Sequence, residues 1–526
     1  MTDSVMGEIL ERCWDVIVIG TGIGGGTIGR RLAEQGLSVL FIEKGRSGHR
    51  AEQNQMAGDE IVDPIARLMR GSWPDPVRAR IEGQERRFHA AIGATVGGSS
   101  VFYAATLERP EPHDLDDSAE RPHPTAGWPI SFTRMLPYFD QAQALFEVRG
   151  QSDPLTRHPT PNLNHAAAVC EGDARLMEGM RRAGLHPYQL HSAMRGIEGC
   201  GSCLGRKCPR PCKLDGRSAG IEPALATGRA AVAECCEVIE LRGEGADVTR
   251  IVARRDGATL EFTARHVVLA AGALSSPRIL LASRSSEWAD GCGNARGQVG
   301  RYLMFHLNEM FALWPRRGEG YAETAKSIGF RDLYHVEGQR FGMVQAMGLD
   351  AGEGEILGYL RSKIDCSPLR RLPGAGHLAR IPAKVAAQVL GQAKVFVGLL
   401  EDMPYAENRV TIDPDRPGGI LIDYSFSAEL HQRRKRFRRL IRSSLKQHRK
   451  LFLTYQPELN FGHPCGSLRM GSDPAKSVVD ARCRVHGMRN LWVADASFMP
   501  TSMGVNPSLT IAANALRVGD AILSAQ

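Results

Sequence analysis

The stretch that decides the fold is "WDVIVIGTGIGGGTIGRRLAEQGLSVLFIEKG", residues 14–45. It opens with a run of β-branched apolar residues, passes through a glycine-rich turn and ends in a second apolar run that reaches Glu43. Continuous apolar runs of this length are typical of buried parallel strands. Residues 26–35, between the two runs, read as a helix. The order strand, glycine turn, helix, strand predicts an α/β domain at the beginning of the chain.

The glycines of the turn have separate roles in such a unit. Gly20 allows a tight turn, Gly22 lets the backbone approach a pyrophosphate, and Gly25 lets the helix pack closely on the strand. The helix N-terminus offers free N–H groups to the phosphates, and Glu43 is placed to accept hydrogen bonds from ribose hydroxyls. Together with Thr21, these residues predict a dinucleotide site. The motif does not choose between NAD and FAD, but its place near the N-terminus favours FAD.

Composition narrows the class of protein. The chain has 526 residues, 43% apolar and 24% charged, which predicts a globular protein of two or three domains. A net charge of +8 hints at an acidic partner but does not indicate nucleic acid. No stretch reads as a membrane span, and the N-terminus is acidic where a secretory signal would be basic. Twelve cysteines are too few for a disulfide scaffold, so we expect a cytoplasmic protein.

Four later segments match one family in its order. They are "GATVGGSSVFYAATLERP" (93–110), "HVVLAAGALSSPRILLAS" (266–283), "ENRVTIDP" (407–414) and the C-terminal run from "GHPCGSLRMG" to "NPSLTIAANALRVGDAI" (462–522). With the glycine motif, they resemble the glucose–methanol–choline (GMC) oxidoreductases, a family of FAD-dependent alcohol oxidases and dehydrogenases. The resemblance covers most of the chain.

The resemblance implies a two-domain architecture in which neither domain is continuous. The first is an α/β FAD-binding domain with a Rossmann-like core, from residues 11–110, 196–304 and 460–526. The second is an α+β substrate-binding domain on an antiparallel sheet, from residues 111–195 and 305–459.

The resemblance also implies site residues. His463 corresponds to a family histidine that faces the N5 edge of the flavin, and Asn506 corresponds to the histidine or asparagine beside it. A neutral His463 would take the hydroxyl proton of an alcohol as general base, Asn506 would hydrogen-bond the substrate oxygen, and flavin N5 would accept the hydride. Pro507 would begin a helix whose N-terminus stabilises charge on the reduced ring. The other implied cofactor-binding positions are Gly97, Gly98, Ser99, Tyr103, Ala104, Val238, Asp495 and Ala496.

Two residues depart from the family pattern. Phe102 stands where some members carry a histidine linked to FAD, so we expect non-covalent FAD. Tyr103 replaces a common asparagine and places the chain nearer the sugar and polyol dehydrogenase branch. We therefore predict oxidation of a sugar, polyol or hydroxylated metabolite. The electron acceptor is expected to be a quinone, a dye-like compound or a protein, and a partner subunit is possible. The alternatives are an oxygen-using alcohol oxidase of the same family and a non-enzymatic flavin or iron–sulfur electron-transfer protein.

The segment "GCGSCLGRKCPRPCK", residues 199–213, groups Cys200, Cys203, Cys208 and Cys212 with the spacing C-x2-C-x4-C-x3-C. Thiolates grouped in this way can hold an iron–sulfur cluster or zinc. The segment resembles the cysteine loop of bacterial glucose and gluconate dehydrogenases in the family, some of which carry a cluster. A disulfide or free thiols in a tight loop is the other reading, and both stay open.

Two further features have plain interpretations. The basic stretch "RRKRFRRLIRSSLKQHRK", residues 433–450, is interpreted as a solvated helix face, with an acidic acceptor or an anionic surface as the alternative partner. His306 and His486 are interpreted as structural histidines rather than catalytic ones.

Overall fold

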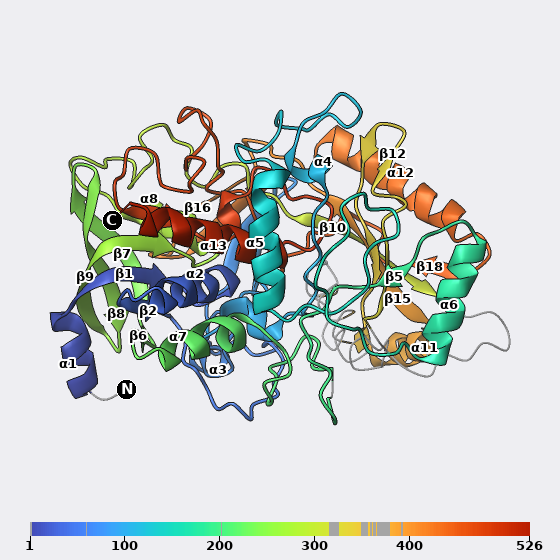
Figure 1. Ribbon diagram of the computed structural model, residues 1–526, viewed down its shortest axis with the longest axis horizontal. Helices are drawn as coiled ribbons and strands as arrows, with labels where there is room; N and C mark the ends of the chain where they lie inside the picture. The colour runs from blue at the N-terminus through green and yellow to red at the C-terminus, as the bar shows by residue number, and fades with distance from the viewer. Residues whose placement is uncertain are drawn as a thin grey trace.

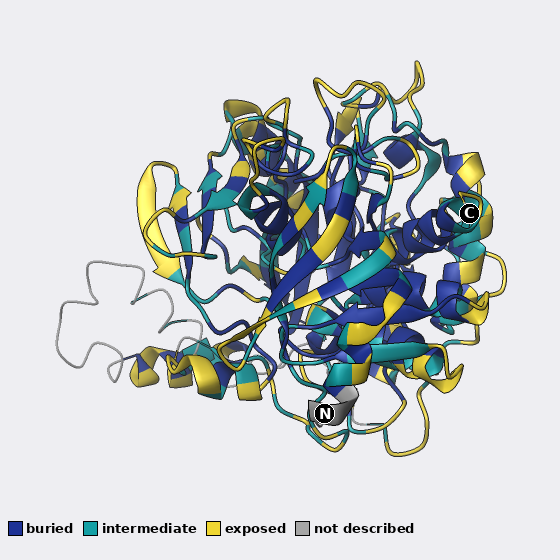
Figure 2. Ribbon diagram, turned by 90° about the vertical axis from the view of Figure 1, so that its left-hand side faces the viewer, coloured by how far each residue is buried: buried dark blue, intermediate teal, exposed yellow. Residues whose placement is uncertain are grey.

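The computed structural model describes residues 3–58, 60–200, 202–314, 326–348, 379–390 and 393–525, together with residues 356, 357, 360 and 364. Figure 1 shows the first and last segments of the chain, blue and red, lying side by side in one half of the molecule. Much of the other half consists of yellow and orange segments, together with the teal helix α6 (Glu171–Arg182). In Figure 2 the interiors of both halves are buried, and exposed residues gather on the outer helices and loops.

A seven-stranded sheet holds the glycine motif. Its order is β6–β2–β1–β9–β8–β7, and β19 also pairs with β9. The pairs β6–β2, β2–β1, β1–β9 and β9–β19 are parallel, whereas β9–β8 and β8–β7 are antiparallel. The bounds are β1 Cys13–Ile19, β2 Val39–Ile42, β6 Ala230–Ala233, β7 Glu237–Glu244, β8 Asp247–Arg255, β9 Ala258–Leu269 and β19 Leu491–Val493.

The predicted strand–turn–helix–strand unit is confirmed. β1 and β2 pair from Val16↔Val39 to Ile19↔Ile42, and α2 (Ile23–Glu34) joins them. All four residues of β2 are buried, as expected for the centre of a parallel sheet. α2 packs against α13 (Ser508–Leu523), and Arg31 and Asp520 form a 2.8 Å ion pair between them. The two ends of the chain therefore build one layer.

A six-stranded antiparallel sheet forms the core of the other half, in the order β18–β10–β15–β14–β11–β5. Helix α12 (Ala428–Ser444) packs on it, and a Cβ at Gly398 of β15 would lie 2.6 Å from the Phe437 ring. The bounds are β5 Tyr188–Gln189, β10 His306–Leu313, β11 Ile328–Phe330, β14 Val344–Ala346, β15 Lys394–Glu401 and β18 Lys450–Phe452.

A four-stranded sheet crosses the predicted division between the domains. β3 (Val77–Ile81) and β4 (Gln84–Phe88) come from the predicted FAD-binding segments, and β16 (Arg409–Ile412) and β17 (Ile420–Tyr424) come from the predicted substrate-binding ones. β17 pairs with β3 in parallel. The strands of the two larger sheets, in contrast, each fall within one set of predicted segments. The division stays a prediction, and this sheet is where it is least sharp.

The remaining elements are short or peripheral. They are α1 Asp3–Glu11, α3 Pro64–Met69, α4 Pro112–Leu115, α5 Phe132–Leu145, α6 Glu171–Arg182, α7 Glu222–Ala226, α8 Ser275–Ala282, α11 Arg380–Leu390, the turns η1 Gly98–Phe102, η2 Gly216–Ile221 and η4 Ala496–Phe498, and the hairpin β12 His335–Val336 and β13 Gln339–Arg340. None of the helices within the described residues has both the length and the apolar character to cross a bilayer.

Helix α12 bears out the predicted solvated face for residues such as Lys435 and Arg439, which are exposed, but not for the whole basic stretch. Arg433 and Arg434 are buried rather than solvated, and Arg434 and Arg438 both pair with Glu309 of β10. The buried carboxylate of Glu309 is paired with cations of the helix packed over it, because burying an unpaired charge costs free energy. Part of the positive charge therefore serves the core.

Candidate active site

A cavity of about 430 Å³ lies where the glycine turn meets the C-terminal segments. Its lining residues fall within 19–24, 42–44, 91–104, 236–238, 270–279, 461–464, 495–496 and 507–511, together with Met56 and Trp73. Most of the predicted cofactor-binding residues border this one space. They are Gly20, Thr21, Gly22, Glu43, Gly98, Ser99, Tyr103, Ala104, Val238, Asp495, Ala496 and Pro507.

The glycine turn is a region of close backbone contact. Gly20 has a φ of +101°, and a Cβ there would lie 2.4 Å from Ala270 O of the neighbouring turn. A Cβ at Gly25 would lie 2.1 Å from Gly20 O. Gly25 does not border the cavity; it lets α2 start tightly against the turn. Gly22 has open space at its Cβ position, on the side where a ligand could approach.

The first turn of α2 fits an anionic ligand. Its N-cap residue is Gly22, and within the described chain no side chain caps it. Ile23 and Gly24 line the cavity at this uncapped end. Free N–H groups at a helix N-terminus favour phosphate oxygens, so the local structure fits the pyrophosphate of a dinucleotide.

Glu43 closes the same end of the cavity. Its carboxylate accepts hydrogen bonds from Thr21 Oγ1 at 2.6 Å and Gly45 N at 3.0 Å. Burial raises the pKa of Glu43 to about 7, against the lowering effect of these bonds. Lys44 and Arg278 also line the cavity here and were not predicted. Lys44 follows Glu43 directly, so a positive charge at this end could have been inferred from the motif.

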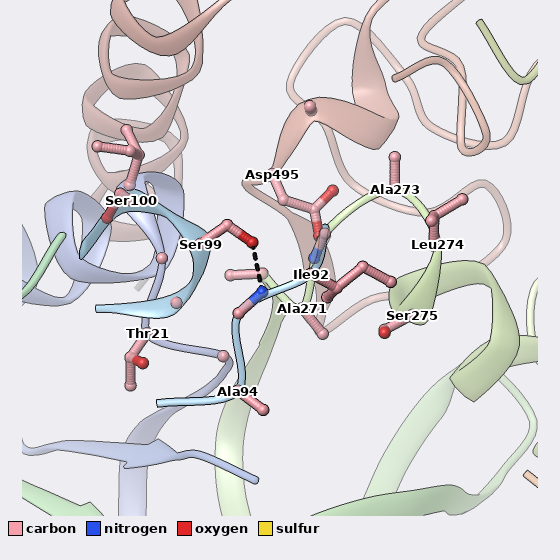
Figure 3. Close-up of a pocket in the computed structure, with 18 of the residues that line it drawn as sticks. Thr21, Ile92, Ala94, Ser99, Ser100, Ala271, Ala273, Leu274, Ser275 and Asp495 are labelled. Atoms are coloured by element: carbon pink, nitrogen blue, oxygen red, sulfur yellow. Dashed lines mark hydrogen bonds between the residues drawn. The ribbon is translucent and has the colours of Figure 1, made fainter. Parts of the chain in front are cut away.

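A second glycine turn packs on the first. Gly97 and Gly98 have φ values of +98° and +57°, and a Cβ at Gly98 would lie 3.0 Å from Gly22 Cα. Gly97 is turned away from the cavity and donates its N–H to Thr21 Oγ1 at 3.0 Å. Ser99 borders the cavity and accepts a 2.8 Å hydrogen bond from Gly93 N, the dashed line in Figure 3.

Asp495 holds a third turn in place, and Figure 3 shows it beside Ala271 and Ala273. Its carboxylate accepts hydrogen bonds from Gly272 N at 2.8 Å and Ser497 N at 2.9 Å, and also from Ser276 Oγ. With its oxygens committed to the protein, this side chain fixes the wall of the cavity. It leaves the backbone of the turn to face a ligand.

The helix predicted to start at Pro507 starts one residue later. Pro507 is the N-cap of α13, whose first helical residue is Ser508. Pro507, Ser508 and Ile511 line the cavity. The N-termini of α2 and α13 therefore open onto the same space, and both helix dipoles favour negative charge there.

A second part of the cavity wall, the imidazole end, has one histidine at the cavity and another histidine behind it. His463 lines the cavity, and its Nδ1 lies 3.1 Å from Nδ1 of His306, the first residue of β10. The rings are close to perpendicular, with centroids 5.1 Å apart. His306 Nε2 contacts Met503 O at 2.9 Å. The first residue of β10 is thus brought against His463 from 157 positions away, and the interpretation of His306 as structural rather than catalytic stays a prediction.

Both imidazoles are neutral at pH 7. Burial lowers the pKa of His463 well below its usual value, and the nearby His306 and Lys326 lower it further. Burial also lowers the pKa of His306 to about 4. A neutral imidazole has one nitrogen with a lone pair, so this end of the cavity can accept a proton.

Asn506 takes a less direct position than predicted. It is buried, but it does not border the cavity as its neighbour Pro507 does. Its Oδ1 has no hydrogen-bond partner in the part of the chain that the structure describes. A buried amide oxygen left unpaired is unusual, so a role for this side chain toward a ligand stays a prediction.

The cysteine loop lies behind the cavity wall. Cys200 Sγ is 3.0 Å from Cys212 Sγ, and Cys203 interacts with Cys208, so the sulfurs form two pairs. Among the described residues, no three His, Cys, Asp or Glu side chains are grouped to hold a metal ion. The loop is attached to the wall by Lys213 Nζ, which donates to Cys203 O at 2.9 Å and to Tyr103 O at 3.3 Å. The described side chains therefore do not support a metal site in this loop.

A mixed sheet with a parallel core, two helix N-termini on one cavity and a buried histidine in its wall are the features expected of a dinucleotide-dependent oxidoreductase. GMC oxidoreductase domains match residues 14–308 and 404–515, and the chain belongs to this family. The resemblance inferred from the sequence motifs is therefore confirmed. Members of the family bind FAD and oxidise the CH–OH groups of alcohols and sugars.

Relatives extend over nearly the whole chain. The paromamine 6'-oxidase of Streptomyces fradiae is 27% identical, covering 97% of this chain and 92% of its own length. The 2-methyl-1,2-propanediol dehydrogenase of Mycolicibacterium austroafricanum is 25% identical, with 97% and 95% covered. The crystal structure of a pyridoxine 4-oxidase from Mesorbium loti shares the fold, with a TM-score of 0.64, 21% identity, and 97% and 99% of the two chains covered.

Proposed function

We propose that this protein oxidises an alcohol CH–OH group with non-covalently bound FAD, and that His463 is the general base. The observation that carries the proposal is that His463 and the uncapped N-terminus of α2 border the same cavity. One end fits a pyrophosphate and the other can accept a proton. An alcohol between His463 and the ring of the FAD anchored there would have both a base for its proton and an acceptor for its hydride.

His463 would remove the hydroxyl proton. Because its pKa lies well below 7, the ring is neutral in ordinary buffer and has a lone pair for that proton. Bound FAD would supply the hydride acceptor at its N5 atom. Asn506 would orient the substrate oxygen through its amide, and its unpaired Oδ1 is compatible with a side chain that awaits a ligand.

The residues proposed to hold FAD form three groups. The turn at α2 would bind the pyrophosphate, Glu43 the ribose, and the N-terminus of α13 the flavin ring, where its dipole would stabilise developing negative charge. Phe102 has no group that could link FAD covalently, so the cofactor would be held by contacts alone. The full proposed set is Gly20, Thr21, Gly22, Gly25, Glu43, Gly97, Gly98, Ser99, Tyr103, Ala104, Val238, Asp495, Ala496, Asn506 and Pro507.

The proposed substrate is a sugar, a polyol or a hydroxylated metabolite, which agrees with relatives named for paromamine and for 2-methyl-1,2-propanediol. We propose a dehydrogenase that passes electrons to a quinone, a dye-like compound or a protein, because Tyr103 departs from the oxidase pattern. The alternative is an oxidase, favoured by the name of the Streptomyces relative. An iron–sulfur cluster is not part of the proposal, because the cysteine sulfurs lie in pairs.

The test is an anaerobic screen of the purified yellow protein against sugars, polyols and other alcohols. A substrate should bleach the flavin absorbance without any added acceptor. Reoxidation is then compared between air and a quinone analogue. Fast reoxidation by the quinone with little peroxide in air selects a dehydrogenase, and stoichiometric peroxide selects an oxidase. A protein that is purified without flavin and takes up none would contradict the proposal.

A further inference from the structure

The contact between His463 and His306 limits which ring nitrogens can carry a hydrogen. Nδ1 of one ring is 3.1 Å from Nδ1 of the other. A hydrogen bond between two nitrogens requires one that carries a hydrogen and one that offers a lone pair, and a neutral imidazole has one nitrogen of each kind. The second contact of His306 decides which ring donates.

His306 Nε2 lies 2.9 Å from Met503 O, in buried surroundings. A carbonyl oxygen can only accept, so this Nε2 must carry the hydrogen. Because burial keeps the His306 ring neutral at pH 7, its Nδ1 then has the lone pair. His306 Nδ1 is therefore the acceptor, and His463 Nδ1–H is the donor.

We propose that His306 is a positioning residue that holds His463 in its Nδ1–H tautomer and so leaves Nε2 of His463 as the proton-accepting atom. The inference rests on the proposed function and specifies which atom performs it. His463 borders the cavity, and its Nε2 makes no hydrogen bond within the described chain. With the opposite tautomer, Nε2 would carry a hydrogen and could not take the proton of an alcohol.

One competing arrangement involves Asn460, whose Nδ2 lies 3.2 Å from the same His463 Nδ1. If that amide donated, His306 Nδ1 would also have to donate, and a neutral His306 would then turn the lone pair of its Nε2 toward Met503 O. Two buried acceptors 2.9 Å apart lose a hydrogen bond and repel each other. The amide of Asn460 is only partly buried and can bond to water instead, so the first arrangement is favoured.

The backbone keeps the two rings in register. Asn460 N donates to His306 O at 2.8 Å, and His463 N donates to Asn460 O at 2.9 Å. Isolated bridges join Leu307 to Leu459 and Met304 to Cys465 on either side of the pair. The turn that bears His463 is thus fastened along the beginning of β10. The ring-to-ring hydrogen bond sets the tautomer within a frame that the backbone already supplies.

The direct test is nuclear magnetic resonance of the holoenzyme labelled with ¹⁵N-histidine. Long-range ¹H–¹⁵N correlations distinguish the two neutral tautomers, and the His463 signals are assigned by their loss in His463→Ala. We expect His463 to be neutral at pH 7 with its hydrogen on Nδ1. A spectrum with the hydrogen on Nε2 would overturn the proposal. This measurement needs no substrate, so it stands even where every alcohol fails to reduce the flavin.

A pair of variants separates tautomer control from simple packing. In His306→Asn the amide oxygen sits near the former Nδ1 position and can still accept from His463, but the contact with Met503 O is lost. In His306→Gln the amide nitrogen can reach Met503 O, but nothing accepts at the Nδ1 position. Asparagine tests the bond to His463, and glutamine tests the bond to the loop.

We expect His306→Asn to keep kcat within about 10-fold, and His306→Gln to lose about 100-fold with KM little changed, since it disables the base rather than binding. Flavin content and melting temperature of both variants show whether the fold is kept. The opposite ranking, with glutamine active and asparagine inactive, would assign His306 to holding the Met503 loop and would overturn the proposal. If neither variant folds, the spectrum of the unmodified holoenzyme decides.

Discussion

The two ends of the cavity are built in different ways. The nucleotide end is framed by backbone: the turn at α2 lies against the turns at Ala270 and Gly98, where a Cβ at Gly20 or Gly98 would be crowded. The imidazole end is made of two side chains joined by one hydrogen bond. Damage to the first end should therefore cost the cofactor and the fold, whereas damage to the second should cost turnover alone. The following predictions can break or sharpen that contrast.

The largest effect is expected from Gly25→Ala. A Cβ there would lie 2.1 Å from Gly20 O, so the turn and α2 must move apart. We expect loss of bound flavin and about 1–3 kcal/mol of stability, the usual cost of overpacking. Absorbance of the purified protein and thermal unfolding measure both. Gly7→Ala is the matched control, because nothing lies within 4 Å of its Cβ position. A variant that is purified yellow and fully stable would remove close packing as the basis of this end.

The next effect is expected from His463→Ala. Loss of a general base should lower turnover at least about 100-fold, while flavin content stays as in the unmodified protein. Steady-state kinetics together with the flavin-to-protein ratio separate the two quantities. His486→Ala serves as control, since His486 contacts Ser477 at 3.0 Å on another turn. If the His463 variant lost its flavin, the division of labour between the two ends would be wrong.

A third prediction concerns the pH dependence of FAD affinity at Glu43. Burial raises its pKa to about 7, and ribose hydroxyls would donate to the ionised carboxylate. Below pH 7 the proton must be released before FAD binds, so the affinity should fall by up to about tenfold per pH unit as the pH decreases, and level off above pH 7. Titration of apoprotein with FAD across this range measures it.

Glu43→Gln provides the control for this pH dependence. The amide cannot ionise, so the variant should bind FAD more weakly at high pH, with an affinity that no longer changes with pH. An unmodified protein whose affinity is flat across pH 7 would exclude Glu43 from ribose binding.

The smallest effect is expected far from both ends. Arg436 of α12 pairs at the surface with Glu337. Exposed pairs contribute little, so Arg436→Gln should change stability by no more than about 0.5 kcal/mol and leave flavin content and turnover unchanged. Arg434→Gln is the informative contrast, because it removes a partner from the buried Glu309. Equal stability of the two variants would mean that the buried pairs of α12 matter no more than its surface pairs.

The nucleotide end could be predicted from sequence because its information is local. Strand, glycine turn, helix and terminal acid all lie within residues 14–45, and each follows from residue type and spacing. The histidine pair could not be predicted in this way. His306 follows an ordinary apolar stretch, and what brings it to His463 is the pairing of distant segments around β10. The family resemblance pointed to His463, but no sequence motif pointed to His306 as its partner.

Two other features depend on distant segments in the same way. The four-stranded sheet joins segments more than three hundred positions apart, such as Ala79 and Ile422, and the sequence motifs did not predict that pairing. The cysteine spacing left a metal site and a disulfide or free thiols open, and within the described loop the side chains meet two by two. Spacing limits how close ligands can come, and only the path of the loop determines which of them meet.

The layer that α2 forms with α13 has a consequence for biosynthesis. The helix that follows the glycine turn is synthesised long before its packing partner, residues 508–523. Contacts of such long sequence separation form slowly, because a large loop must close first. The helix must therefore wait, with an apolar face uncovered, until residues 508–523 have been synthesised. During that interval chaperone binding would be most useful to the nascent protein, and cofactor capture has to come afterwards.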